Sequence, residues 1–300
     1  MGRKLDIDSR YDLKDEQIES FRTRGFVKLK DVLSPEVLAH FGAEFTKMVH
    51  SSNKQTLPME ERNTYQKAFI QIGNLRHKSE LVKNFVFGKR LPRIASELLG
   101  TRGVRMYHDQ ALYKEGGGGF TPWHADEYYW PLATEKCCTV WIPLQETPLE
   151  MGPVAYAEGS HHFTYGRDFK ISDESEEKIQ RALADENFNV VQEPYDLGEV
   201  SFHYGWTFHR AEGNETDRAR EVMTIIYMDI DMRLKEPENE NQINDRAGCC
   251  PGVEVGEIID SVENPVLYEA DGSKIENWET ESSESEPPKT RIINQPIRER

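Results

Sequence analysis

The sequence has few cysteines, no long apolar run and a deficit of basic side chains. Its four Cys occur as two adjacent pairs, Cys137-Cys138 and Cys249-Cys250, among 300 residues. This arrangement fits neither a secreted disulfide framework nor a Cys-x-x-Cys zinc site. No apolar stretch approaches the ~20 residues that cross a bilayer, and the first residues lack the apolar core of a signal peptide. We therefore expect reduced, buried thiols in a cytoplasmic protein.

The charge balance narrows the class of partner. The chain has 37 Lys and Arg against 53 Asp and Glu, which gives a formal net charge of −16. Non-specific binding to nucleic acid or to an anionic membrane depends on clustered basic side chains. We expect neither partner, and a small-molecule substrate is the class that remains. The sequence carries no signal that sets an oligomeric state.

Helical patterns dominate the first hundred residues. Apolar side chains recur at helical spacing over residues 14–24, 34–49 and 79–99, with Ser34 as an N-cap and Gly100 as a C-terminal stop. Alternating patterns predict strands at the ranges 25–30 and 69–75, and the polar residues 51–66 read as irregular.

The pattern changes after Gly103. We predict strands over residues 104–113, 137–144, 190–194, 199–203 and 219–228, a helix near 176–184, and loops at 116–119 and 232–265. Short strands without βαβ alternation favour an α+β fold in which an antiparallel double-sheet jelly roll follows a helical layer. We expect one domain over residues 1–270 and a polar tail, mobile or partner-dependent, over 271–300.

One short motif carries metal-binding chemistry. His124 and Asp126 are two residues apart, so on a strand both side chains would point to one face. Taken alone, the pair is more often a hydrogen-bonded surface pair than a metal site. Aromatic side chains surround it, and we regard some of them as walls of a substrate pocket: Trp123, Tyr128, Tyr129 and Trp206.

A third ligand type lies downstream. His203 and His209 both follow the later strands, and Arg220 comes eleven residues after the second histidine. Two imidazoles and one carboxylate form the facial triad of non-haem Fe(II) oxygenases, and an arginine offers a bidentate fork to a dicarboxylate. We prefer His209 as the ligand and interpret His203 as a packed or hydrogen-bonded neighbour. Lys114 either lines the pocket or is exposed beside the glycine loop.

Several blocks together resemble the phytanoyl-CoA dioxygenase family of Fe(II)/2-oxoglutarate oxygenases. The similar stretches lie between about residue 15 and residue 230: Phe21-Arg-Thr-Arg-Gly-Phe-Val27, Leu33-Ser-Pro-Glu-Val-Leu38, Trp123-His-Ala-Asp126, Val140-Trp-Ile-Pro-Leu144, Gly152-Pro-Val154, Gly159-Ser-His161, and Gly198 to His209 followed by Arg220. The resemblance implies that iron is bound by His124, Asp126 and His209. It also implies that Arg220 holds the far carboxylate of 2-oxoglutarate, in a pocket lined by Trp141 and Gln110.

The resemblance also implies a reaction. An enzyme of this kind uses Fe(II), O2 and 2-oxoglutarate, releases succinate and CO2, and hydroxylates or otherwise oxidises an unactivated C–H of a small organic molecule. Among the substrates of the family, the acidic charge balance and the aromatic side chains near the motif favour a natural-product intermediate over a polyanionic CoA thioester. Halogenating relatives replace the carboxylate ligand by a small residue, so Asp126 favours oxygen chemistry. Ala125 and Ala211 depart from the family pattern, and the second stands where relatives carry a hydroxyl toward 2-oxoglutarate.

Two other functions remain compatible with the residues. The first is a cupin-type metalloenzyme that does not use 2-oxoglutarate, and Arg220 speaks against it because only a dicarboxylate needs that arginine. The second is a non-catalytic binding module on the same scaffold. A binding module has no need for three converging ligand residues.

Overall fold

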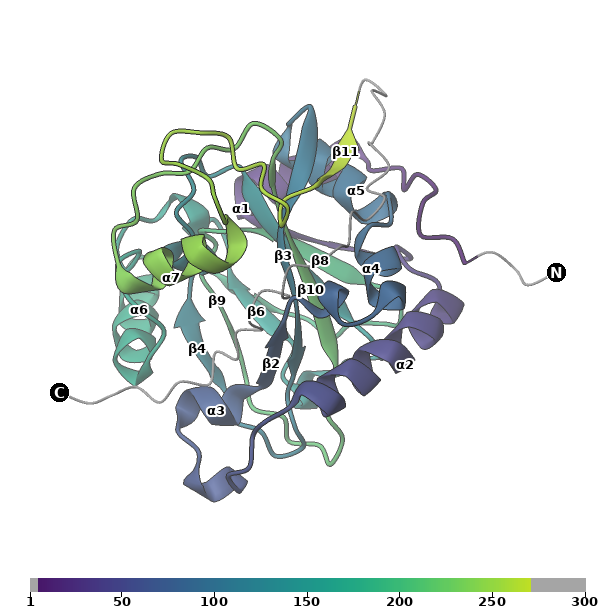
Figure 1. Ribbon diagram of the computed structural model, residues 1–300. Helices are drawn as coiled ribbons and strands as arrows, with labels where there is room; N and C mark the ends of the chain where they lie inside the picture. Colours follow the sequence, from purple (N-terminus) through teal and green to yellow (C-terminus); the bar gives the residue numbers. More distant parts are fainter. Residues whose placement is uncertain (1–4, 271–300) are drawn as a thin grey trace.

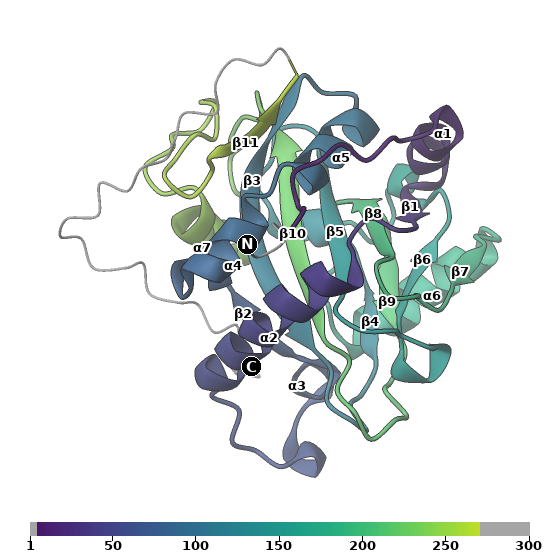
Figure 2. The same ribbon diagram turned by 90° about the vertical axis from the view of Figure 1, so that its right-hand side faces the viewer.

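Two antiparallel sheets form the centre of the molecule, and the computed structural model describes residues 5–270 (Figures 1 and 2). One sheet has seven strands in the order β1-β8-β5-β10-β3-β11, with β2 also paired to β3, and the other has four in the order β4-β9-β6-β7. The strands are β1 (Phe26–Leu29), β2 (Ile70–Gly73), β3 (Gly103–Tyr113), β4 (Thr121–His124), β5 (Cys137–Pro143), β6 (Val154–Ala157), β7 (Val190–Gln192), β8 (Val200–Tyr204), β9 (His209–Ala211), β10 (Val222–Asp229) and β11 (Val266–Glu269).

Helices cover one face of the larger sheet. Figure 2 shows α2, α4 and α5 in front of that sheet, while α6 lies beside the smaller one. The helices are α1 (Asp15–Arg24), α2 (Pro35–Ser52), α3 (Thr64–Ala68), α4 (Glu80–Val86), α5 (Arg90–Leu99), α6 (Asp173–Asp185) and α7 (Glu240–Cys249). Short 3₁₀ turns are η1 (Met59–Glu61), η2 (Leu75–His77), η3 (Asp126–Tyr129), η4 (Leu149–Met151) and η5 (Ser160–His162). The apolar stripe of α2 and the outer face of β3, β5 and β10 share one hydrophobic core.

Most expected elements are present, with small displacements of their ends. Ser34 caps α2 through its hydroxyl, which accepts a hydrogen bond from the Val37 amide at 3.3 Å. Gly100 ends α5 in the left-handed conformation, at φ 65°. All four cysteines are buried free thiols. The expected tail, residues 271–300, lies outside the described residues.

The single helix expected over residues 79–99 is wrong. The chain forms α4 and α5 separately, and the break falls at Phe87-Gly88-Lys89. Pro92 explains the break, because a proline inside a helix has no N–H for residue i−4 and clashes with that residue's carbonyl. Here residue i−4 is Gly88, so the helix cannot continue through it, whereas Pro92 fits the first turn of α5.

The sequence interpretation also missed elements in segments read as irregular. Helix α3 lies within the polar stretch before β2, and α7 lies within the expected loop region 232–265. Asn239 marks the start of α7, because its side chain accepts a hydrogen bond from the Gln242 amide at 3.0 Å. Among the described residues, no helix combines the length and apolarity that a membrane crossing requires.

The two sheets face each other through polar side chains as well as apolar ones. The Tyr156 hydroxyl on β6 lies 2.8 Å from the Ser201 hydroxyl on β8. Thr139 on β5 donates a hydrogen bond to Asp126, which directly follows the β4 segment. Polar groups buried between sheets need partners, so a polar interior of this kind marks a site and not a simple core.

Candidate metal centre

His124 and Asp126 reach the space between the sheets from the end of β4. The strand ends at His124, so Asp126 is not strand-borne as the sequence interpretation assumed, and instead opens η3. The intervening Ala125 still has extended backbone angles, φ −121° and ψ 133°. An extended residue between them keeps both side chains on one side, which preserves the geometry that the motif predicts.

His209 is brought to the pair by sheet pairing. It begins β9 and lies directly opposite His124 in the antiparallel ladder, and paired residues in a ladder point to the same face. The two imidazole ring centres are 4.2 Å apart. The two histidines are 85 positions apart in the sequence, so this contact exists only because β4 and β9 are neighbours.

Both histidines are held with one nitrogen free for a ligand. His124 Nδ1 lies 2.7 Å from the Pro122 carbonyl oxygen, and His209 Nδ1 lies 2.9 Å from that of Thr207. A backbone acceptor at Nδ1 places the proton there and leaves Nε2 with its lone pair. Each Nε2 is 3.7 Å from Asp126 Oδ1, and the three ligand atoms lie within 4.8 Å of one another.

The second oxygen of Asp126 is occupied by the protein. Oδ2 accepts a hydrogen bond from the Thr139 hydroxyl at 2.8 Å and lies 3.2 Å from His203 Nε2. Burial favours the neutral acid, but His209, His203 and His124 outweigh it and lower the pKa of Asp126. The carboxylate is therefore charged and oriented, with Oδ1 facing the two imidazoles.

The protonation states of the histidines suit a metal. Burial, reinforced by His209, lowers the pKa of His124 to about 4. Burial also lowers the pKa of His209 to about 4. Both imidazoles are neutral at physiological pH, which is the form that coordinates a metal. Two neutral nitrogens and one carboxylate oxygen in this arrangement fit Fe(II).

His203 lies beside this cluster with both ring nitrogens engaged. Nε2 faces Asp126, Nδ1 lies 3.3 Å from the Tyr156 hydroxyl, and the side chain is buried. This placement matches the interpretation of His203 as a hydrogen-bonded neighbour. Sequence reasoning missed Thr139 and Tyr156, since neither carries a local signal and both act through contacts between strands.

The His203→Phe variant should bind Fe(II) about 10- to 100-fold more weakly than the wild-type chain, because partners that orient a ligand carboxylate typically have effects of that size. The measurement is anaerobic Fe(II) titration, with Tyr195→Phe as a control that removes a buried hydroxyl bonded to Ser201. Complete loss of metal binding in His203→Phe would instead make His203 a direct ligand.

Three residues expected at a cosubstrate pocket lie along the same interior face. Trp141 on β5 and Gln110 on β3 both lie opposite Thr224 of β10. Trp141, Thr224 and Gln110 therefore form one row across the three strands. Thr139 lies two residues from Trp141, toward Asp126. Arg220 is buried at the other end, with its guanidinium carbon 5.5 Å from the centre of the Trp141 ring.

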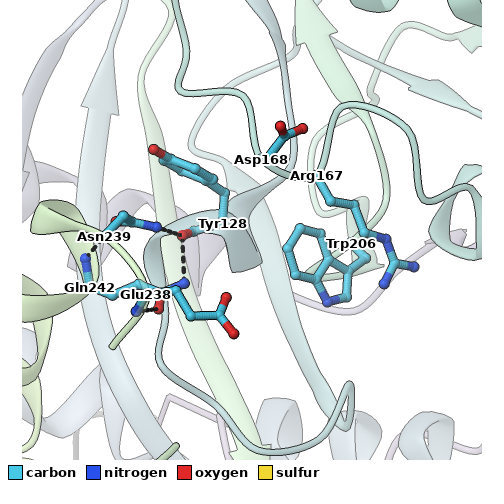
Figure 3. A pocket seen from close by; sticks show the side chains of 7 residues that line it. All are labelled: Tyr128, Arg167, Asp168, Trp206, Glu238, Asn239 and Gln242. Atoms are coloured by element: carbon cyan, nitrogen blue, oxygen red, sulfur yellow. Dashed lines mark hydrogen bonds between the residues drawn. The ribbon is translucent and has the colours of Figure 1, made fainter. Parts of the chain in front are cut away.

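A pocket with a volume of about 360 Å³ is lined in part by residues that are close in sequence to the cluster. Figure 3 shows the residues that line it: Tyr128, Arg167, Asp168, Trp206, Glu238, Asn239 and Gln242. Tyr128 and Trp206, two of the aromatic residues expected to line a substrate pocket, are among them. Tyr128 is close in sequence to Asp126, and Trp206 is close to His209. The Glu127 amide donates to the Gly205 carbonyl at 3.0 Å, which ties the two segments together.

The other two expected aromatic walls are placed differently. Trp123 is 2% exposed and packs in a cluster under α6. The Tyr129 hydroxyl accepts a hydrogen bond from the Ile171 amide at 3.1 Å, and its ring packs beside the core near α7. Sequence reasoning missed the acidic and amide side chains of the pocket. Gln242 lies on α7, which was expected to be a loop, Glu238 and Asn239 immediately precede that helix, and Asp168 comes from the segment before α6.

Fold and site together define a class of protein: two facing antiparallel sheets with a His-x-Asp…His cluster suited to a metal between them. The profile of the phytanoyl-CoA dioxygenase (PhyH) family matches residues 21–222. This span is more than half of the chain, and the protein belongs to that family.

Known relatives agree with this assignment. A probable alpha-ketoglutarate-dependent hypophosphite dioxygenase of Stutzerimonas stutzeri is 21% identical over 230 residues, 72% of this chain and 79% of that protein. The alpha-ketoglutarate-dependent carbocyclase SnoK from nogalamycin biosynthesis superposes with a TM-score of 0.70 at 24% identity, over 86% of this chain and 97% of its own. The structure of EctD from S. alaskensis with 2-oxoglutarate and 5-hydroxyectoine superposes with a TM-score of 0.62 at 20% identity, over 79% of this chain and 82% of its own.

Proposed function

We propose that the protein is an Fe(II)/2-oxoglutarate-dependent dioxygenase that hydroxylates an unactivated C–H of a small organic molecule. The observation that carries the proposal is the convergence of His124 Nε2, His209 Nε2 and Asp126 Oδ1. In this proposal the two sheets form a double-stranded β-helix, and residues 1–270 act as one catalytic domain. The shared core of the N-terminal helices and the larger sheet supports that domain assignment.

The chain's own residues divide the work along the interior face. His124, Asp126 and His209 would hold Fe(II) through two imidazole nitrogens and one carboxylate oxygen. Arg220 would bind the far carboxylate of 2-oxoglutarate, with Trp141 and Gln110 in the row between the two ends. With both groups bound, the chemistry that the site acquires is O2 activation coupled to decarboxylation of 2-oxoglutarate to succinate and CO2.

The pocket supports a substrate that is aromatic or alicyclic and bears polar groups. Tyr128 and Trp206 present rings to it, and Arg167 lies over the Trp206 ring at 4.6 Å (Figure 3). Asp168 and Glu238 add carboxylates at its edge. Rings with a few fixed polar groups are typical of sites for small organic ligands. A natural-product intermediate fits this description.

The direct test is succinate release from 2-oxoglutarate by the Fe(II)-loaded protein, with a panel of hydroxylatable ring compounds as substrates. We expect release that depends on both Fe(II) and O2 and that at least one panel member accelerates. The product is identified by a mass gain of one oxygen from ¹⁸O2. A gain of oxygen without succinate would favour a cupin-type metalloenzyme that does not use 2-oxoglutarate. Ligand binding without any turnover would favour a binding module.

A further inference from the structure

Two buried cations lie opposite each other at the end of the larger sheet. The Lys114 amide donates to the Arg220 carbonyl at 2.9 Å, and the Arg220 amide donates to the Lys114 carbonyl at 2.8 Å. This reciprocal pair continues the β3–β10 register just beyond the two strands. Residues paired in this way project to the same face. Lys114 is 0% exposed and Arg220 is 2% exposed.

Neither cation has a carboxylate within ion-pair distance in the described part of the chain. The Lys114 ammonium donates to the Gly119 carbonyl and lies 3.5 Å from the Thr121 hydroxyl. Arg220 donates to the Gly152 carbonyl, and its buried Nε has no hydrogen-bond partner among the described residues. The buried charge of Arg220 without a counter-ion is costly, so the space beside Arg220 and the Lys114 amine suits an anion.

Two other arginines with little exposure have carboxylate partners. Arg76 is buried and is held by the carboxylates of Asp109 and Glu263. Arg210 is partly buried and is paired with Glu176 at 3.1 Å, although its Nε has no hydrogen-bond partner among the described residues. Both guanidinium charges are therefore compensated by carboxylates, whereas that of Arg220 is not. The sequence left two positions open for Lys114, and the exposed position beside the glycine loop is wrong because the side chain is buried.

The pair faces the same interior space as the metal cluster. Alternation along β3 and β10 places Lys114 on the face of Gln110, and Arg220 on the face of Thr224. Thr121 lies opposite Ala211 in the smaller sheet, and Ala211 is two residues from His209. The Thr121 side chain therefore belongs to the same interior face. It lies opposite Ala211, the position at which relatives carry a hydroxyl toward 2-oxoglutarate.

We infer that Lys114 is a second cationic contact for the far carboxylate of 2-oxoglutarate, acting with Arg220 and with the Thr121 hydroxyl in place of the one absent at Ala211. The inference rests on the proposed function. It assigns the far carboxylate two cations and a hydroxyl donor, whereas the sequence assigned it Arg220 alone. One end of the cosubstrate would then lie at the metal cluster and the other at this pair.

The acid–base state of the lysine supports this role. Burial, reinforced by Arg220, lowers the pKa of Lys114 to about 6, with Glu212 opposing and Arg210 adding to the decrease. Above about pH 6 the free protein therefore holds a neutral amine, and an arriving carboxylate favours its protonation. Binding of 2-oxoglutarate near pH 8 should take up a proton, and the affinity should weaken as pH rises from about 6 to about 8.

The test compares two keto acids on the anaerobic Fe(II)-loaded full chain. 2-Oxopentanoate keeps the keto-acid end of 2-oxoglutarate but has a methyl group in place of the far carboxylate. The Lys114→Met variant should bind 2-oxoglutarate about 10- to 100-fold more weakly, because a hydrogen bond to a charged group is removed. Its affinity for 2-oxopentanoate should be unchanged. Calorimetry in buffers of different ionisation enthalpy should show proton uptake for the wild type and none for the variant.

Two further variants keep the experiment decisive. Lys114→Gln retains a donor for the Gly119 carbonyl, so it replaces the methionine variant if that protein does not fold, and the same loss is expected. Lys28→Met is the matched control, because Lys28 is partly buried but paired with Glu193 and Glu199. Equal losses for both keto acids would make Lys114 a structural residue and overturn this inference alone. Failure of the wild type to bind 2-oxoglutarate would overturn the proposed function as well.

Discussion

The Asp126→Ala variant is expected to lose Fe(II)-dependent turnover of 2-oxoglutarate, with a decrease of more than about 100-fold. Asp126 would supply the only carboxylate in the cluster, and its Oδ1 faces both Nε2 atoms. Even residues that only orient a metal ligand typically change metal affinity or activity by about 10- to 100-fold, so removal of a ligand should exceed that range. The variant also leaves two neutral imidazoles without the negative charge that compensates a cation.

Succinate release and Fe(II) titration measure this effect independently. Asp231→Ala is the matched control, since Asp231 forms an ion pair with Arg102 in which both side chains are half exposed. Surface pairs of this kind contribute about 0–1 kcal/mol, so the control should retain activity and fold. Asp126→Ala protein with wild-type metal affinity and turnover would remove the basis of the metal assignment. A loss of fold, seen as a lowered unfolding temperature, is checked on the metal-free proteins.

The Arg220→Met variant should raise the KM for 2-oxoglutarate by about 30-fold or more. Truncating one partner of a buried hydrogen-bonded charge pair costs about 2–5 kcal/mol, and each 1.4 kcal/mol is a factor of ten in affinity. Arg220 is fully buried with no carboxylate partner in the described chain, so its charge is available to the cosubstrate. Turnover at saturating 2-oxoglutarate should fall less than the KM rises, because the metal ligands are untouched.

Arg210→Met provides the comparison for this variant. Arg210 is a partly buried arginine ten residues earlier in the chain, and the Glu176 carboxylate neutralises it. The KM for 2-oxoglutarate should stay near the wild-type value in that variant. If both arginine variants raise the KM equally, the effect is one of general packing, and the cosubstrate lies elsewhere. If the affinities for 2-oxopentanoate and 2-oxoglutarate become equal in Arg220→Met and not in Arg210→Met, the far carboxylate of 2-oxoglutarate binds at Arg220.

The helical layer and the strands were predictable because their signals are local. Ser34 before Pro35 predicts the start of α2, and the alternation after Gly103 predicts β3. The break between α4 and α5 was not predicted because the apolar periodicity continues through it. Pro92 interrupts the backbone hydrogen bonding of the helix but does not change the periodicity of the apolar side chains. Helix α7 escaped for the opposite reason, since its polar residues give little periodicity and its position depends on packing against η3.

By itself, the sequence determined the chemistry that the protein can hold. His124, Asp126, His209 and Arg220 were identified from residue type, spacing and family resemblance, and the structure brings the first three together. Only the tertiary structure decided which groups surround them, because those contacts join strands that are distant in the chain. Pairing of β4 with β9 separates the roles of His209 and His203. Pairing of Lys114 with Arg220 shows that this lysine, whose position the sequence left open, is buried and faces the interior.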